Sequence, residues 1–184
     1  MTKDEFVKTS AEQGYDQAFN ALLTDIAEQD TEELVEQAEA AEYEEDFVKA
    51  AELLAEKGNA DAQFFLGCIY YKGRGVKQDI AKATEWYRKA AEQDHYPAQN
   101  NLGFAYDEGE GVQQNYAKAI ELYRKSAEQG YPPAQNNLGY MYQHGRGVEQ
   151  DLALAKEWYE KAAAQDFEPA KEHLAEHKEM RNEQ

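Results

Sequence analysis

The chain has 184 residues and a net charge of −18. This length suits one domain with a sizeable buried core, and so negative a chain repels nucleic acid phosphates and anionic membrane surfaces. We therefore expect neither nucleic acid nor a membrane as a partner. Its single cysteine, Cys68, cannot form an internal disulfide, and we find neither an export signal nor a membrane-length apolar run. The expected location is the cytoplasm.

The acidic charge is concentrated in residues 1–61, which hold 18 Asp and Glu against 4 Lys and Arg. Thirteen carboxylates lie between residues 9 and 48, with no Lys or Arg among them. We interpret 1–61 as degenerate, repeat-like helices. The carboxylates either form the solvated side of these helices or attract a basic partner, which would relieve repulsion between like charges four residues apart. The candidate residues for such contacts are Glu32, Glu36 and Glu39.

A 36-residue period follows the acidic region. Ala62, Ala98 and Ala134 each open the same sequence, Ala-x-x-x-Leu-Gly-x-x-Tyr-x-x-Gly-x-Gly-Val. A period of this length indicates one supersecondary unit that stacks on copies of itself. The predicted units are 62–97, 98–133 and 134–169, and the polar segment 170–184 is expected to form a helix that caps the stack. Together these parts are expected to form a single solenoid domain.

Each unit is predicted to contain two antiparallel helices. Ala98, Leu102 and Tyr106 share one helical face, and the equivalent residues of the next unit are Ala134, Leu138 and Tyr142. We expect all six to be buried. Gly103, inside the first helix, predicts close approach of a neighbouring helix, while Gly109 and Gly111 predict its end. Asn115 is a predicted N-cap of the second helix. Because no strand-like alternation occurs, the predicted fold is all-α, an α-solenoid of helix pairs.

The same motif, followed by Asp-x-x-x-Ala-x-x-Trp-Tyr-x-Lys-Ala-Ala-x-Gln, resembles the Sel-one-like repeat, a longer relative of the tetratricopeptide repeat. The resemblance covers 62–169, with Leu122-Tyr123 in place of Trp-Tyr in the middle copy. It implies an α-solenoid whose first helices line a concave face. It also implies adaptor or scaffold roles and no shared chemistry.

A candidate groove lies on the first helices, opposite the predicted core. Asn is a poor helix former, so paired Asn residues in mid-helix need a reason. They either line a groove that hydrogen-bonds a peptide backbone or bridge neighbouring helices. The stripe opposite the core contains Phe64, Cys68, Tyr71, Asn100, Phe104, Asp107, Asn136, Tyr140 and Gln143, flanked by Asn101 and Asn137. Of these, Asn100, Phe104, Asn136 and Tyr140 are expected to be solvent-accessible along one concavity.

His173, Glu176 and His177 form the only string that resembles a catalytic motif, the H-x-x-E-H arrangement of some zinc proteases. Only seven residues follow His177, too few to add a downstream third ligand. An ordinary exposed pair of histidines is the simpler interpretation. We therefore expect no catalytic residues, no bound metal and no cofactor.

The sequence favours a non-enzymatic module that binds a protein or peptide, with basic partners preferred. Three alternatives stay open: a toxin-neutralising immunity protein, a subunit that self-associates, and a metal-dependent hydrolase at the H-x-x-E-H string. The sequence does not determine the oligomeric state.

Overall fold

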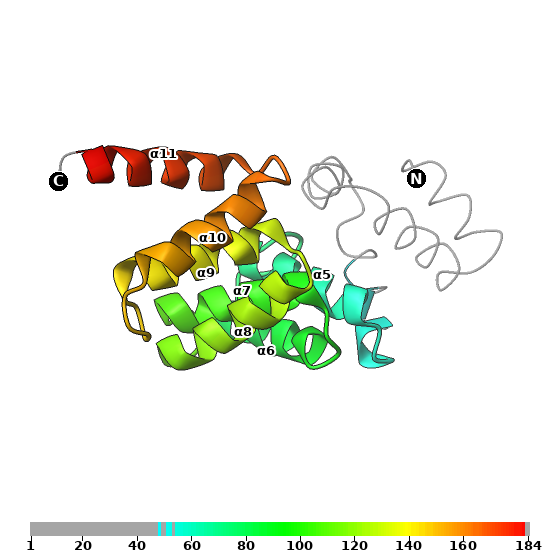
Figure 1. The fold of residues 1–184 in the computed structure, drawn as a ribbon. Helices are drawn as coiled ribbons and strands as arrows, with labels where there is room; N and C mark the ends of the chain where they lie inside the picture. The colour runs from blue at the N-terminus through cyan, green and yellow to red at the C-terminus, as the bar shows by residue number, and fades with distance from the viewer. Residues whose placement is uncertain (1–47, 49–50, 53, 183–184) are drawn as a thin grey trace. The chain divides into compact units, whose positions relative to one another are not determined.

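The computed structural model describes residues 48, 51–52 and 54–182, with side chains as far as Ala175. In these residues helices are the only regular elements and no strand occurs, which confirms the predicted all-α fold. The helices labelled in Figure 1 are α5 (Ala60–Lys72), α6 (Ile80–Ala91), α7 (Tyr96–Glu108), α8 (Tyr116–Glu128), α9 (Pro132–His144), α10 (Leu152–Ala163) and α11 (Glu168–Asn182).

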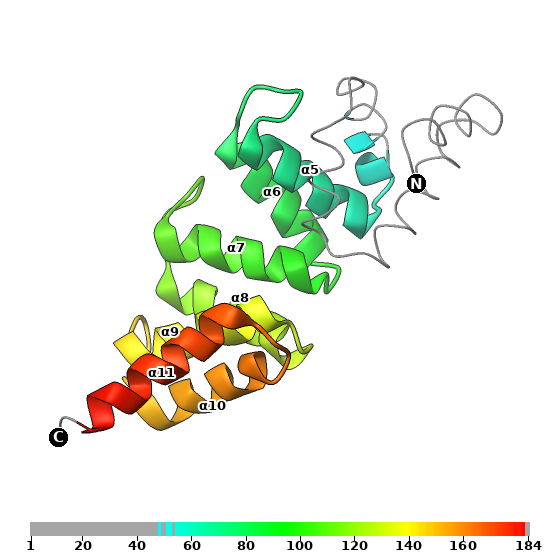
Figure 2. The ribbon, with the colours of Figure 1, turned by 90° about the horizontal axis from the view of Figure 1, so that it is seen from above.

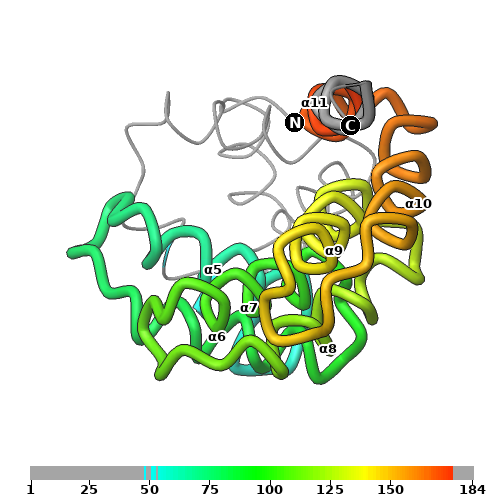
Figure 3. The backbone as a smooth tube through the Cα atoms, turned by 60° about the vertical axis from the view of Figure 1, so that its left-hand side comes forward, coloured from blue at the N-terminus to red at the C-terminus, as the bar shows by residue number. Residues whose placement is uncertain are grey.

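The residues form two compact units that meet in the sequence between Ala90 and Ala91. The first unit contains the pair α5 and α6. In the second unit each helix packs on the next one along the chain, from α7 through to α11 (Figures 2 and 3). The second unit therefore has the arrangement of helical hairpins stacked one on another.

Short polar side chains begin the second helices, as predicted. The Asn115 side chain accepts a hydrogen bond from the Lys118 backbone N–H at 3.1 Å, and Asp151 does the same for Leu154 at 2.9 Å. At the other end of α7, Gly109 adopts a left-handed conformation with φ 75°, and its N–H bonds to the Ala105 carbonyl. Most residues with a side chain are strained at that φ, so glycine is the residue that suits this helix end.

The glycine in the middle of each first helix lies against a tyrosine ring. A Cβ placed on Gly103 would come within 2.9 Å of the Tyr123 ring, and one on Gly139 within 2.8 Å of the Tyr159 ring. Both distances are shorter than any ordinary carbon–carbon contact. The close helix approach predicted from Gly103 is confirmed, and the neighbour is the second helix of the same hairpin.

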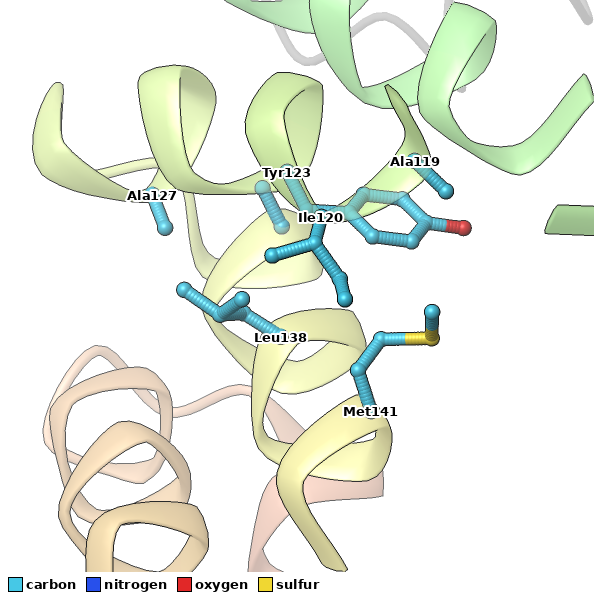
Figure 4. Packing of buried hydrophobic residues seen from close by; sticks show 7 residues of the cluster. Ala119, Ile120, Tyr123, Ala127, Leu138 and Met141 are labelled. Carbon is cyan, nitrogen blue, oxygen red and sulfur yellow. The ribbon is translucent and has the colours of Figure 1, made fainter. Parts of the chain in front are cut away.

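Figure 4 shows the central core of the second unit, where α8 packs over α9. Leu102 and Leu138 are buried, as are Ala98 and Ala134, as predicted. Tyr106 and Tyr142 differ from the prediction because they are half-buried. For Tyr142 the reason is its hydroxyl group, which reaches the surface and accepts a hydrogen bond from Arg124 at 2.8 Å.

Two buried glutamines, Gln99 and Gln135, hold hydrogen bonds within and between the hairpins. Gln135 Nε2 donates to the Ala127 carbonyl at 3.2 Å, and Gln165 Nε2 donates to Gln135 Oε1 at 3.0 Å. The same pattern occurs one period earlier, where Gln129 Nε2 donates to Gln99 Oε1 at 2.9 Å. Since buried polar groups need partners, these bonds satisfy the buried amides. The bond from Gln135 to Ala127 also joins the α9–α10 hairpin to the preceding α7–α8 hairpin.

We expect Leu102→Ala to lower the free energy of unfolding by about 2–5 kcal/mol, because it leaves a cavity under α7. Phe104→Ala, two residues away on the exposed side, is the matched control and should change it by less than about 0.5 kcal/mol. Urea denaturation followed by circular dichroism measures both. Equal losses for the two variants would mean that the assigned core face of α7 is wrong.

Candidate functional site

The helices α7 and α9 lie in register, and two sets of side-chain contacts join them, one in mid-helix and one at their carboxyl ends. Asn137 Nδ2 on α9 donates to Asn100 Oδ1 on α7 at 3.0 Å. Beyond the end of α9, Arg146 Nη2 lies 3.0 Å from Asp107 Oδ1 and 3.2 Å from Glu108 Oε1. Residues one period apart on the two helices therefore occupy neighbouring places.

This packing corrects part of the predicted groove. Asn100 and Asn136 were expected to be accessible, but each is only 8% exposed. Asp107 and Gln143 of the same stripe are buried as well. The reason is that this side of each first helix faces the next first helix. Asn100 bonds to Asn137, and Asn136 Oδ1 accepts a hydrogen bond from His173 Nδ1 on α11 at 3.0 Å. The asparagines thus bridge neighbouring helices, which was the alternative interpretation.

The accessible side of α7 and α9 differs from the predicted stripe by one residue at each end. Asn101 and Asn137 replace Asn100 and Asn136, and Glu108 and His144 replace Asp107 and Gln143. Phe104 is 40% exposed, Tyr140 is half-buried, and so are Asn101 and Asn137. One turn beyond the aromatic residues, Glu108 and His144 are exposed. We call these six residues the open face: Asn101, Phe104 and Glu108 of α7, and Asn137, Tyr140 and His144 of α9.

Three amide side chains form a continuous chain of hydrogen bonds beneath the open face. Asn137 Nδ2 donates to Asn100 Oδ1, and Asn100 Nδ2 donates to Asn101 Oδ1 at 3.3 Å. Within the described part of the chain, Asn101 Nδ2 and Asn137 Oδ1 have no further hydrogen-bond partner. The chain therefore ends in one donor and one acceptor, both on half-buried residues.

Aromatic and cationic groups surround Tyr140. The His144 ring lies on it with 4.0 Å between centroids, and the His144 Nδ1–H donates to the Tyr140 carbonyl at 3.0 Å. The Arg146 guanidinium carbon lies 5.8 Å from the Tyr140 ring and 4.9 Å from the Tyr116 ring. Glu108, His144 and Arg146 were absent from the sequence-based site. Glu108 and His144 could have been found as the residues one helical turn after Phe104 and Tyr140.

The carboxyl group of Asp107 is buried beside this face. Burial raises its pKa above the ordinary range, the nearby Arg146 guanidinium opposes that rise, and the Glu108 carboxylate adds to it. Arg146 thus offsets part of the cost of burying a charged Asp107. No sequence signal predicts this pair, which joins residues from consecutive repeats.

The predicted groove residues of the first unit lie on α5. Phe64, Cys68 and Tyr71 are half-buried, and the Phe64 ring lies 5.9 Å from the Tyr87 ring. Burial raises the pKa of the Cys68 thiol, whose sulfur accepts from the Tyr87 hydroxyl at 3.5 Å. A thiol with a raised pKa is a poor nucleophile at neutral pH.

The H-x-x-E-H string has a structural use at its first position. His173 bonds to Asn136 and stacks on Tyr159 with 4.8 Å between ring centroids. The side chains of Glu176 and His177 lie outside the described residues, as do Glu32, Glu36 and Glu39 of the acidic region. Among the side chains that the structure does describe, no three His, Cys, Asp or Glu converge as a metal site requires. The described helices include none with the length and apolar character that crossing a bilayer demands.

Comparison with known proteins gives a family match over most of the periodic region. The Sel1 repeat model matches residues 60–95, 97–131 and 132–167. The structure of a Sel1 repeat protein from Oxalobacter formigenes superposes with a TM-score of 0.73 at 32% identity, covering 93% of this chain and 71% of that one. A protective antigen of uropathogenic Escherichia coli with an SLR fold gives 0.68 at 44% identity, covering 70% of this chain and 28% of that one.

A curated relative is the ERAD-associated E3 ubiquitin-protein ligase component HRD3A of Arabidopsis thaliana. It is 43% identical over 53 residues, which is 28% of this chain and 8% of HRD3A. The chain therefore spans a small part of that protein and of the Escherichia coli antigen. What these matches share is the repeat.

We expect Arg146→Gln to destabilise the protein in a pH-dependent way. The pKa of Asp107 is raised in the folded state. Protonated Asp107 is therefore compatible with folding at pH values below its unfolded-state pKa, and this contribution to the free energy of unfolding is lost as pH rises through the folded-state pKa. Removing Arg146 raises that folded pKa further. The loss of unfolding free energy should be about 1–3 kcal/mol at about pH 7 and smaller at about pH 4.

The control is Lys156→Gln, which breaks an exposed pair with Glu160 and should cost less than about 1 kcal/mol. Urea unfolding at the two pH values measures both variants. A loss for Arg146→Gln that is independent of pH would contradict the role assigned to Asp107.

Proposed function

The chain belongs to the Sel1 repeat family, and we propose that it is a non-enzymatic module that binds a protein or peptide through the open face. Sel1-repeat proteins are generally protein-interaction modules. The single observation that supports this face is the exposed side chain of Phe104 on α7, which stands one period before Tyr140 of α9. Among the described residues, the amide chain on the same two helices ends in an unused donor and an unused acceptor. Large aromatic side chains with nearby hydrogen-bonding groups are the usual anchors of protein interfaces.

Charge supports a basic partner. The chain carries −18 overall and −14 in residues 1–61, so a negative potential extends into solvent and accelerates encounters with positive surfaces. We place this function in the cytoplasm, in agreement with a single cysteine that forms no internal disulfide.

A photo-reactive amino acid placed at position 104 should cross-link the partner in cells of the native host. The same amino acid at Glu121, an exposed residue of α8, is the control and should give no such product. With the partner purified, Phe104→Ala should weaken binding by about tenfold or more, as loss of an interface anchor does, while the melting temperature stays unchanged. Cross-linking from position 121 but not from 104 would place the binding surface on another face.

The acidic region gives a second test with the same partner. Replacing Glu32, Glu36 and Glu39 by Gln should slow association and reduce its dependence on salt, since the Debye length falls to about 8 Å at physiological ionic strength. Stopped-flow association rates at low and high salt measure the effect. If the partner is acidic, or if the association rate depends neither on salt nor on this triple change, the acidic region does not attract the partner and serves only solubility.

A further inference from the structure

We propose that the open face recognises a Lys or Arg side chain within an extended segment of the partner. This inference rests on the proposed function and specifies its ligand chemistry. One residue of the segment bonds to Asn101 through its carbonyl oxygen and to Asn137 through its N–H, and the basic side chain passes along Phe104 and Tyr140 toward Glu108.

The amide chain selects a peptide backbone. Asn101 Nδ2 is a donor and Asn137 Oδ1 an acceptor, and the two intervening hydrogen bonds, of 3.3 and 3.0 Å, fix both side chains in place. One residue of an extended chain offers the complementary pair on one side of the backbone, a carbonyl oxygen and an N–H. A folded helix or sheet has already used these groups, so the matching ligand is an extended segment.

The carboxyl end of α7 is short of positive charge. Its last turn contains Asp107 and Glu108 and no basic residue, although the partial negative charge of a helix C-terminus favours cations there. Glu110 follows two residues later. Arg146 supplies one guanidinium to both Asp107 and Glu108. The Glu108 side chain remains 43% exposed, so a second cation can reach it from solvent.

The aromatic residues fit the stem of such a cation. Helical spacing places Phe104 one turn before Glu108 on the same side of α7, and Phe104 is 40% exposed. The aliphatic part of Lys or Arg covers apolar surface while its charged end stays with a carboxylate, and cations favour aromatic faces. Arg146 already makes this contact with Tyr116, its guanidinium carbon lying 4.9 Å from the ring.

An acidic segment fits this face poorly. Its carboxylate would meet Glu108, and the net charge of −18 would oppose its approach. An apolar segment would cover Phe104 but leave Glu108 in contact with Arg146 alone. The basic segment satisfies the amide ends, the aromatic surface and the charge together.

A display library of random linear peptides, selected on the full-length protein, tests the inference. The selected peptides should be enriched in Lys or Arg at one fixed position. For a synthetic peptide from the selection, Glu108→Gln should weaken binding by about tenfold. The control is Glu128→Gln, which changes the exposed last residue of α8 and should leave affinity unchanged.

A second variant separates the aromatic contribution from a general loss of fold. Phe104→Leu keeps an apolar side chain but removes the ring, and it should lower affinity for the Arg peptide more than for the same peptide with norleucine in place of Arg. Peptides without a fixed basic position, or a selection that yields no peptide, would overturn the inference. So would equal effects of Glu108→Gln and Glu128→Gln.

The proposed function is judged separately. A partner that cross-links at position 104 and binds more weakly to Phe104→Ala, yet is unaffected by Glu108→Gln, would retain the binding face and reject the basic side chain. If no cross-link forms at position 104 but the peptide selection succeeds, the preference for a basic side chain is retained and the proposed function is rejected. The face would then bind peptides without binding the cellular partner.

Discussion

A tyrosine ring lying on a glycine sets the spacing on which the rest of this structure depends. The contact occurs at Gly67 with Tyr87, at Gly103 with Tyr123 and at Gly139 with Tyr159. Glycine in mid-helix costs about 1 kcal/mol relative to alanine in helix propensity, and here the missing Cβ makes room for a buried aromatic ring. Because the same contact recurs at each period, the hairpins of the second unit present α7 and α9 in equivalent positions.

Buried amides then convert equal spacing into a defined register. Gln135 bonds to the Ala127 carbonyl of the preceding hairpin, and Asn137 bonds to Asn100 of the preceding first helix. An amide away from water must find partners, so a shift of one hairpin against the next would leave several unsatisfied groups at once. Asn100 and Asn136, on the packed side, use their side chains in hydrogen bonds to neighbouring helices. Among the described residues, Asn101 Nδ2 and Asn137 Oδ1, one position farther round the two helices, have no hydrogen-bond partner.

The repeats share their core and differ at their surface. Leu102 corresponds to Leu138, and Gly103 to Gly139, whereas Glu108 corresponds to His144 and Glu110 to Arg146. Identical core residues build the same scaffold, while the differing surface residues give each repeat its own charge. In the second unit the differences combine, because Arg146 from one repeat bonds to Asp107 and Glu108 of the preceding one. This ion-pair cluster is therefore a property of adjacent repeats, since one repeat supplies the two carboxylates and the next supplies the guanidinium.

The sequence by itself determined the helices, their ends and their core faces. Leu102 lies on a 3.6-residue stripe, Asn115 is at an N-cap and Gly109 is at a helix end, and each of these features depends on residues within a turn or two of one another. The open side of α7 was decided by the tertiary structure. On an isolated helix Asn100 and Asn101 are equally exposed. Packing of α9 against α7 buries Asn100 and leaves Asn101 partly accessible. Arg146 was beyond prediction for the same reason, because it meets Asp107 across 39 residues of sequence. Local periodicity specifies which face of a helix is apolar, but only the neighbouring helix decides which polar side chains it covers.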